Sequence, residues 1–260
     1  MIDYSFSLYD LEYFLLIFTR ISCFVFIAPF FGMANTPRRI KVVLSLYVAT
    51  LMYFVLTPAP AVLPKTVLGF AIIVTKEAVT GLLIGLSAQM CTSIVLFSGA
   101  VADMEIGLSM VQLMDPATKQ STTFTGALYN YALTMALIAS GMYRYLLGAL
   151  ADSYKLIPVN GAVFNSEKLL QSSIVFLTDY MSIGFRIILP VFCAILLLNA
   201  VLGIMARVAP QMNMFAIGIQ LKILVGLSIL FVSILLLPKI SEIIFDEIRK
   251  TMVSFVEAMY

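Results

Sequence analysis

Long apolar runs alternate with short polar segments along the chain. Residues 13–37 carry Arg20 as their single charge, and the basic cluster at 38–41 follows them. Residues 42–64 carry no charge, and at ~1.5 Å per residue a helix of this length can cross a bilayer. Prolines late in this run predict that the helix ends near Thr57. We therefore expect two apolar helices near the start of the chain.

The next run is too long for one ordinary membrane span. Residues 66–102 are apolar except for Lys76 and Glu77. This pattern predicts either two short helices or one long helix with an ion pair halfway. The segment at 103–120 contains charges, a glycine and a proline, which are typical of a loop.

The second half repeats long apolar runs joined by polar segments. We expect, in order, a helix at 121–143, a short helix and a loop at 145–168, an apolar stretch at 169–206 with a kink at Pro190, a turn at 207–213, and a helix at 214–237 closed by Pro238.

The tail, residues 239–260, differs from these runs because it is amphipathic. Its apolar residues recur with a helical period, and charged residues occupy most of the other face. We expect this helix to lie on a membrane surface or against a partner, rather than across the bilayer.

The amino-acid composition indicates a membrane protein. Of 260 residues, 62% are hydrophobic and 12% are charged, and the mean hydropathy is +1.04. Soluble domains are about half apolar and about a quarter charged. The chain is therefore predicted to be an all-α, polytopic membrane protein. A net charge of +2 argues against a nucleic-acid partner.

The absence of certain residue types excludes several kinds of catalytic and metal site. The chain has no histidine, which excludes a Ser-His-Asp triad and an HExxH zinc site. Cys23, Cys91 and Cys193 are isolated within apolar runs, so neither a metal site nor a redox pair is expected. We predict no catalytic residues, no metal and no cofactor.

Several charges lie within or beside the apolar runs. Each costs about 2.5–3.5 kcal/mol at bilayer depth. Some could lie at helix ends and extend to the interface, which suits Asp179 and Arg207. We favour the other explanation, in which these helices face other subunits or a water-filled lumen. The charges are Arg20, Lys76, Glu77, Asp179, Arg186, Arg207 and Lys222.

Two further features are a pair of glycines at helical spacing and a loop with an unusual number of apolar residues. Gly81 and Gly85 form a GxxxG spacing, which permits close approach of two helix backbones. The loop at 103–120 is unusually apolar for a water-facing segment, since it contains Ile106, Leu108, Met110, Val111, Leu113 and Met114.

Ordered blocks of residues carry a family resemblance. They are Thr19-Arg20-Ile21-Ser22, Ala28-Pro29-Phe30-Phe31, Pro37-Arg38-Arg39-Ile40-Lys41, Lys76 to Gly85, Gly107-Leu108-Ser109-Met110 with Asp115-Pro116, Ser153-Tyr154 with Pro158, and Arg207 to Phe215 with Gly218 and Lys222. In this order they resemble the FliR family of flagellar export-gate proteins.

The resemblance implies an architecture. Residues 1–168 would form a FliP-like helical part, residues 169–238 a FliQ-like hairpin with its tip at Pro210-Gln211, and residues 239–260 an amphipathic C-terminal helix. The assembled gate would be a helical cone, partly outside the membrane. Buried polar residues would then face neighbouring subunits, namely Arg20, Lys76, Glu77, Arg186, Arg207, Gln211, Asn213 and Lys222.

The resemblance also implies a non-enzymatic function. The chain would be a structural and gating subunit of the flagellar type III export gate in the bacterial inner membrane, within the flagellar basal body. Unfolded flagellar subunits would pass through the gate. Partners would be FliP-like and FliQ-like subunits, FlhB-like and FlhA-like export proteins, and membrane lipid.

A closing plug would come from the apolar loop. Its apolar bulk would exclude water and ions, and Gly107 would give the backbone freedom. An alternative is that the same residues pack under a neighbouring helix. The predicted plug residues are Ile106, Gly107, Leu108, Met110, Val111, Leu113 and Met114.

Two alternatives remain open at this point. One is the homologous gate subunit of a virulence injectisome. The other is a small polytopic transporter that would use Lys76, Glu77 and Arg186 as substrate or proton sites. An intramembrane enzyme is disfavoured, because it would need a base and histidine is absent.

Overall fold

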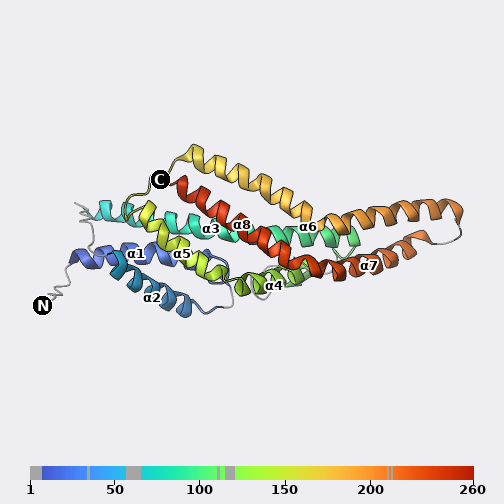
Figure 1. The fold of residues 1–260 in the computed structure, drawn as a ribbon, viewed down its shortest axis with the longest axis horizontal. Coiled ribbons are helices and arrows are strands. Elements are labelled where there is room, and N and C mark those ends of the chain that lie inside the picture. Colours follow the sequence, from blue (N-terminus) through green and yellow to red (C-terminus); the bar gives the residue numbers. More distant parts are fainter. Residues whose placement is uncertain are drawn as a thin grey trace. The chain divides into compact units, whose positions relative to one another are not determined.

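A computed structural model describes residues 8–33, 36–56, 66–109, 112–114, 121–209, 211 and 213–260. Nearly all of these residues are helical, as Figure 1 shows, so the predicted all-α class is confirmed. The elements are α1 (Leu8–Ile27), α2 (Arg38–Leu56), α3 (Val67–Ile106), β1 (Gln112–Met114), β2 (Ser121–Thr123), α4 (Phe124–Ala139), α5 (Met142–Leu156), α6 (Ser166–Val208), α7 (Met214–Ser233), a 3-10 turn (Ile234–Leu236) and α8 (Leu237–Glu257). Within the described residues, four helical stretches are long and apolar enough to cross a membrane, or up to five if α4 and α5 form one broken span.

The long run after residue 66 forms one helix. α3 has 40 residues, which corresponds to ~60 Å of helix. It continues through Asp103, where the sequence predicted a loop. Gly107 ends it with a left-handed backbone, φ +93°. The N–H groups of Gly107 and Leu108 both donate to the Asp103 carbonyl, at 3.0 and 2.8 Å, which is a glycine C-cap.

Pro238 does not close a helix, so that prediction is wrong. α7 ends at Ser233, the 3-10 turn Ile234–Leu236 follows, and Pro238 is the second residue of α8, so a new helix begins at this proline. A proline is tolerated in the first turn of a helix, because the N–H group that it lacks has no carbonyl partner there. Pro190 likewise lies inside α6, which the structure describes as one helix from Ser166 to Val208.

The chain divides into two compact units. The first contains Met1–Met90, Gly141–Val175 and Glu247–Tyr260, and the second contains Cys91–Ser140 and Phe176–Asp246. α3, α6 and α8 each contribute to both units. The predicted boundary between a FliP-like part and a FliQ-like hairpin, after residue 168, stays a prediction.

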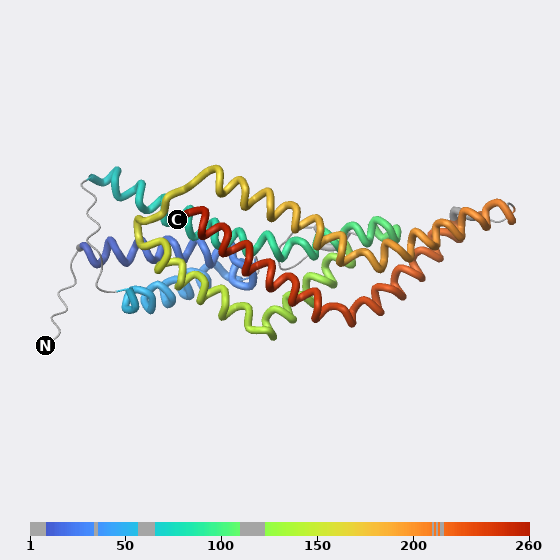
Figure 2. Tube along the Cα trace, turned by 45° about the horizontal axis from the view of Figure 1, so that its top comes forward, coloured from blue at the N-terminus to red at the C-terminus, as the bar shows by residue number. Residues whose placement is uncertain are grey.

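In the first unit, α1 and α2 pack side by side (Figures 1 and 2). One side of α1 is fully buried, and so is the apolar side of the last turns of α8. Val163 and Asn165 donate backbone hydrogen bonds to Met259 and Ala258, at 3.0 and 3.3 Å. The expectation that this tail covers a membrane surface or a partner is therefore corrected, because its own chain buries Ile248, Met252, Phe255, Val256 and Met259.

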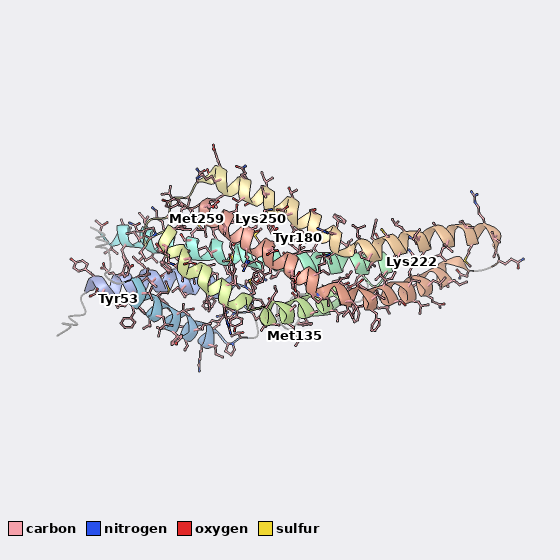
Figure 3. The ribbon with its side chains drawn as sticks, viewed as in Figure 1. Tyr53, Met135, Tyr180, Lys222, Lys250 and Met259 are labelled. Atoms are coloured by element: carbon pink, nitrogen blue, oxygen red, sulfur yellow. The ribbon has the colours of Figure 1, made fainter. Side chains whose placement is uncertain are left out.

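In the second unit, the last part of α6 and the first part of α7 lie side by side, at the right-hand end of Figure 2. A Cβ added at Gly218 would lie 3.5 Å from the Leu202 side chain, which is ordinary contact. Side chains project outward from both helices (Figure 3). Many of these are large, apolar and exposed, among them Leu197, Val201, Ile204, Val208, Leu224, Phe231 and Val232.

Candidate functional site

A buried ion pair is the most concentrated polar feature of the first unit. Nε of Arg20 on α1 lies 2.5 Å from Oε2 of Glu77 on α3. Both side chains are fully buried. A buried charge is tolerated when it is paired and when its remaining hydrogen-bonding groups are satisfied.

The segment that follows α5 adds two hydrogen bonds to this ion pair, whereas Nη2 of Arg20 is buried without a hydrogen-bond partner among the described residues. Nη1 of Arg20 donates to the Ile157 carbonyl at 2.9 Å, and the Asn160 N–H donates to Oε1 of Glu77 at 2.8 Å. The guanidinium also lies 4.2 Å from the centre of the Tyr154 ring, a cation–π contact. The Tyr154 hydroxyl donates to the Ile17 carbonyl at 3.2 Å. We call Arg20, Glu77, Tyr154, Ile157 and Asn160 the charge cluster; it ties α1, α3 and the end of α5 together.

Glycine lets α1 and α3 approach closely enough for this contact. A Cβ added at Gly81 would lie 2.1 Å from the Arg20 carbonyl oxygen, far inside normal contact. At Gly85 an added Cβ would lie 3.0 Å from the Phe24 carbonyl. The close backbone approach that the GxxxG spacing predicted is confirmed, and its partner is α1 of the same chain.

The second unit holds a different buried carboxylate. Asp103 in the last turns of α3 is fully buried. Its Oδ2 accepts from the Thr125 N–H at 2.7 Å, and its Oδ1 accepts from the Thr125 hydroxyl at 2.5 Å. Thr125 is in the first turn of α4, where unpaired N–H groups favour an anion. Thr123 holds the N-cap position but makes no side-chain cap bond, so Asp103 supplies the cap from another helix.

The α3–α4 crossing around this contact is also close. A Cβ added at Gly99 would lie 2.3 Å from Cα of Gly126. β1 and β2 pair antiparallel beside it, with Gln112 opposite Thr123 and Met114 opposite Ser121. The two ends of the predicted plug segment are thus held together, by the Asp103–Thr125 contact and by the strand pair.

The structure divides the predicted plug residues. Ile106 is the last residue of α3 and is fully buried. A Cβ added at Gly226 of α7 would lie 2.6 Å from the Ile106 side chain, so Ile106 packs in the core rather than in the loop. Gly107 and Leu108 follow the helix, and Leu113 and Met114 are in β1. Met110 and Val111 lie outside the described residues.

The other predicted polar residues are dispersed. Arg20 and Glu77 are buried as predicted, but they face each other and not a neighbouring subunit, so that part of the prediction is corrected. Lys76 and Lys222 are half-buried, and Figure 3 labels Lys222 on α7. Exposed side chains are those of Arg186, Arg207, Gln211 and Asn213. The Asn213 side chain accepts from the Ala216 N–H at 3.4 Å and so caps α7.

Sequence reasoning missed several participants. The sequence places Asp103 in a loop, although Gly107, four residues later, is the residue type that commonly ends a helix. Thr125, Tyr154 and Asn160 carry no signal by themselves, because a threonine, a tyrosine or a backbone N–H becomes important only through what the fold places beside it.

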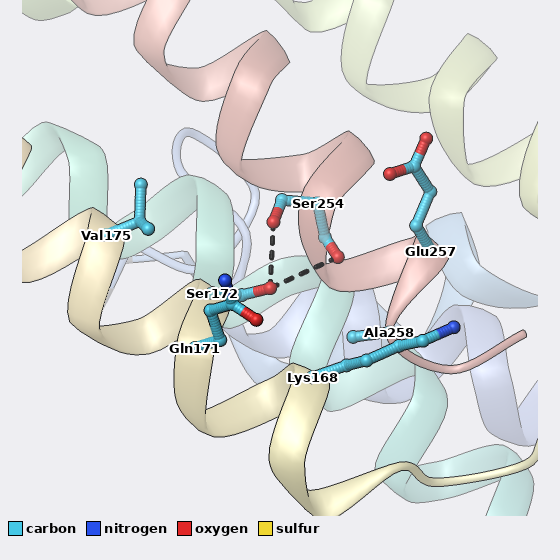
Figure 4. A pocket seen from close by; sticks show the side chains of 7 residues that line it. All are labelled: Lys168, Gln171, Ser172, Val175, Ser254, Glu257 and Ala258. Carbon is cyan, nitrogen blue, oxygen red and sulfur yellow. Dashed lines mark hydrogen bonds between the residues drawn. The ribbon is translucent and has the colours of Figure 1, made fainter.

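A polar hollow lies elsewhere in the first unit. Figure 4 shows Ser172 of α6 facing Ser254 of α8, and the Ser254 hydroxyl donates to the Ser172 hydroxyl at 2.8 Å. The hollow has a volume of about 290 Å³ and is flanked by Lys168 and Glu257. Within the part of the chain that the structure describes, no group of three or more acidic or cysteine side chains is placed to hold a metal ion.

Comparison with known proteins shows which family this chain is similar to. The profile described as "Bacterial export proteins, family 1" matches residues 11–248. This chain belongs to that family. The match includes Glu77, Asp103 and the first half of α8, and it therefore extends beyond the blocks that first suggested the resemblance.

Curated relatives agree with the family assignment. Over 222 residues the chain is 30% identical to the "Flagellar biosynthetic protein FliR" of Bacillus subtilis, with 84% of this chain and 85% of that protein covered. It is 28% identical over 249 residues to the protein of the same name from Aquifex aeolicus, covering 94% and 93%. The Escherichia coli protein of that name is 24% identical over 235 residues, covering 88% and 87%. The predicted family is confirmed.

Proposed function

We infer that this chain is a subunit of the flagellar protein-export apparatus in the bacterial inner membrane, where it forms part of the flagellar basal body. The observation that carries the inference is the family match along residues 11–248, together with the four helical stretches of the described chain that are apolar enough to cross a membrane. The relatives' printed names add the flagellar context.

A structural role fits how the buried polar groups are used. Glu77 is occupied by Arg20 and by the Asn160 N–H, and Asp103 is occupied by Thr125. These contacts join helices to one another. They therefore support a framework subunit of a multi-subunit export apparatus rather than a catalytic one.

The finer proposal is that the chain forms part of the export gate. Unfolded flagellar subunits would cross the membrane through it, and FliP-like, FliQ-like, FlhB-like and FlhA-like proteins would surround it. The exposed apolar faces of α2, α6 and α7 support this proposal, because such surfaces need either lipid or protein to cover them.

Co-purification tests this proposal directly. The chain is expressed with the FliP-like and FliQ-like proteins of its own genome, extracted in mild detergent and weighed by native mass spectrometry. We expect one hetero-oligomer that contains this chain. A chain that stays monomeric, or that pairs only with itself, would contradict the proposal.

The closing plug is proposed with a smaller set of residues. Ile106 leaves it because it belongs to the core, while Gly107, Leu108, Leu113 and Met114 stay. Leu108→Ser is expected to raise the ion conductance of cells that carry the complex, with complex yield unchanged. Leu128→Ser, at an exposed position on α4, is the matched control. Unchanged conductance with Leu108→Ser would contradict the assignment.

The transporter alternative loses its main support. It required Glu77 as a substrate or proton site, but this carboxylate is fully buried and paired with Arg20. Of its two other proposed residues, Arg186 is exposed, and Lys76 is half-buried on the opposite side of α3 from Glu77.

A further inference from the structure

The outer face of the first part of α3 differs from its inner face. Glu77, Thr80 and Ile84 are fully buried toward the core. On the opposite face, a stripe follows the helical spacing i, i+3, i+4, i+7, i+8 and i+11. We call it the α3 stripe; it consists of Leu68, Ala71, Ile72, Thr75, Lys76 and Val79, and with Phe164 it lines a hollow of about 470 Å³.

Most of the stripe is apolar and uncovered. Leu68 is 78% exposed and Ile72 is 61% exposed. The Thr75 hydroxyl donates to the Ala71 carbonyl at 2.9 Å, so its hydrogen-bonding need is met within the helix. The stripe therefore presents one unsatisfied polar group, the Lys76 ammonium, among apolar neighbours.

Lys76 has no partner among the described residues. The adjacent carboxylate, Glu77, is on the other side of α3 and is held by Arg20. Apolar residues flank Lys76 along the stripe on both sides, Ile72 before it and Val79 after it. Whatever covers this face must bring apolar surface at both ends and one anion between them.

Small residues indicate the shape of the occupant. Ala71 and Thr75 are four residues apart and are bordered by the bulkier Leu68 and Ile72. A small-xxx-small spacing lets a second helix approach closely. The stripe spans ~16 Å of helix, about three turns, which is enough for one helix crossing. Phe164 forms one wall, and hydrogen bonds of its neighbours Val163 and Asn165 to the end of α8 hold that wall in place.

We propose that the α3 stripe is the docking surface for an apolar helix of a different membrane subunit, and that this helix carries a carboxylate that pairs with Lys76. The proposal rests on the proposed role in a multi-subunit apparatus. A phospholipid fits less well, because its charge lies at one end and not between two apolar segments. A second copy of this chain is the other candidate, and the crosslinking experiment below distinguishes it from a different subunit.

Charge reversal tests the pairing in the complete complex. Lys76→Glu is expected to lower the yield of the hetero-oligomer at least tenfold, and Lys76→Arg is expected to keep most of it. Lys155→Glu is the control, since Lys155 is 77% exposed and pairs only with Asp152 across one helical turn. Normal yield with Lys76→Glu would overturn the proposal and leave the proposed function standing, whereas failure of the unaltered chain to co-purify would overturn both.

Photo-crosslinking identifies the occupant without altering Lys76. A photoreactive amino acid replaces Ile72, and the complex is irradiated in membranes and digested. A crosslink to a different subunit, in a peptide that contains Asp or Glu, is expected. Replacing that acid by lysine should restore assembly of Lys76→Glu. A crosslink only to phospholipid, or only to a second copy of this chain, would overturn the proposal.

Discussion

Among the described residues, each compact unit holds one fully buried carboxylate, and the two are neutralised by different means. Glu77 pairs with the full positive charge of Arg20. Asp103 has a backbone N–H and a hydroxyl at the first turn of α4, whose helix dipole offers only a partial positive charge. The first contact joins three chain segments, and the second joins two.

The difference teaches what each contact contributes. Removing Glu77 would leave a buried cation with no counter-charge, which is among the more costly changes in a folded protein. Removing the Asp103 carboxylate would leave neutral donors, one of which belongs to a hydroxyl that can turn elsewhere. The charge cluster should therefore determine whether the first unit forms, whereas Asp103 should adjust how firmly α3 and α4 are joined.

Glu77→Ala is expected to have the largest effect. It leaves the Arg20 guanidinium buried and unpaired, at a cost of about 3–5 kcal/mol. We expect a large fall in the amount of folded chain in membranes and in complex yield, measured by quantitative immunoblotting and native mass spectrometry. Glu167→Ala, at an exposed position in the first turn of α6, is the control. A wild-type yield from Glu77→Ala would contradict the claim that Glu77 matters more for folding than Asp103 does.

Replacing both charges sharpens the same comparison. Arg20→Met combined with Glu77→Met leaves no unpaired charge, so we expect it to be more stable than either single change. Thermal unfolding of the detergent-solubilised chain measures this coupling. Additive losses would show that the two side chains act independently.

The glycine crossings rank next, and they occur in both units. Gly81→Ala forces a Cβ against the Arg20 carbonyl, and Gly99→Ala forces one against Gly126. Each is expected to cost about 1–3 kcal/mol through overpacking. Gly148→Ala has open space around the new Cβ and should be neutral or slightly stabilising. Equal behaviour of all three in thermal unfolding would argue against close crossings.

Asp103→Ala should have a smaller effect than Glu77→Ala. Loss of a helix cap costs about 0.5–2 kcal/mol. Thr125→Val removes one of the two bonds to Asp103 and should cost less than Asp103→Ala. Hydrogen exchange at the start of α4 should increase in both variants. A loss with Asp103→Ala as large as that with Glu77→Ala would mean that Asp103 has a charged partner.

Asp152→Ala should have the smallest effect. Asp152 and Lys155 form an ion pair at 2.7 Å in which both side chains are largely exposed. Such pairs contribute about 0–1 kcal/mol, so the melting temperature should hardly change. A marked shift would mean that this surface packs against something in the assembly.

The sequence by itself determined the class, the family and most helices. Apolar runs exceed what a soluble domain can bury, which makes the membrane assignment a matter of composition. The GxxxG spacing of Gly81 and Gly85 predicted a close backbone approach, because it leaves one face of an apolar helix without bulky side chains. The end of α3 was only approximate, because the charges predicted a loop from residue 103, whereas the helix continues to Ile106 and ends at the left-handed Gly107.

Only the tertiary structure decided which partners the polar residues have. A neighbouring Lys76 could have paired with Glu77, yet Arg20 does so from fifty-seven positions away, because helix geometry puts residues 76 and 77 on different faces. Ile106 is a second example: the sequence predicted it in a loop, whereas packing against Gly226 of α7 buries it in the core. Local pattern fixes where a helix forms and which side is apolar, but the choice among polar partners depends on contacts between distant segments, which no local pattern contains.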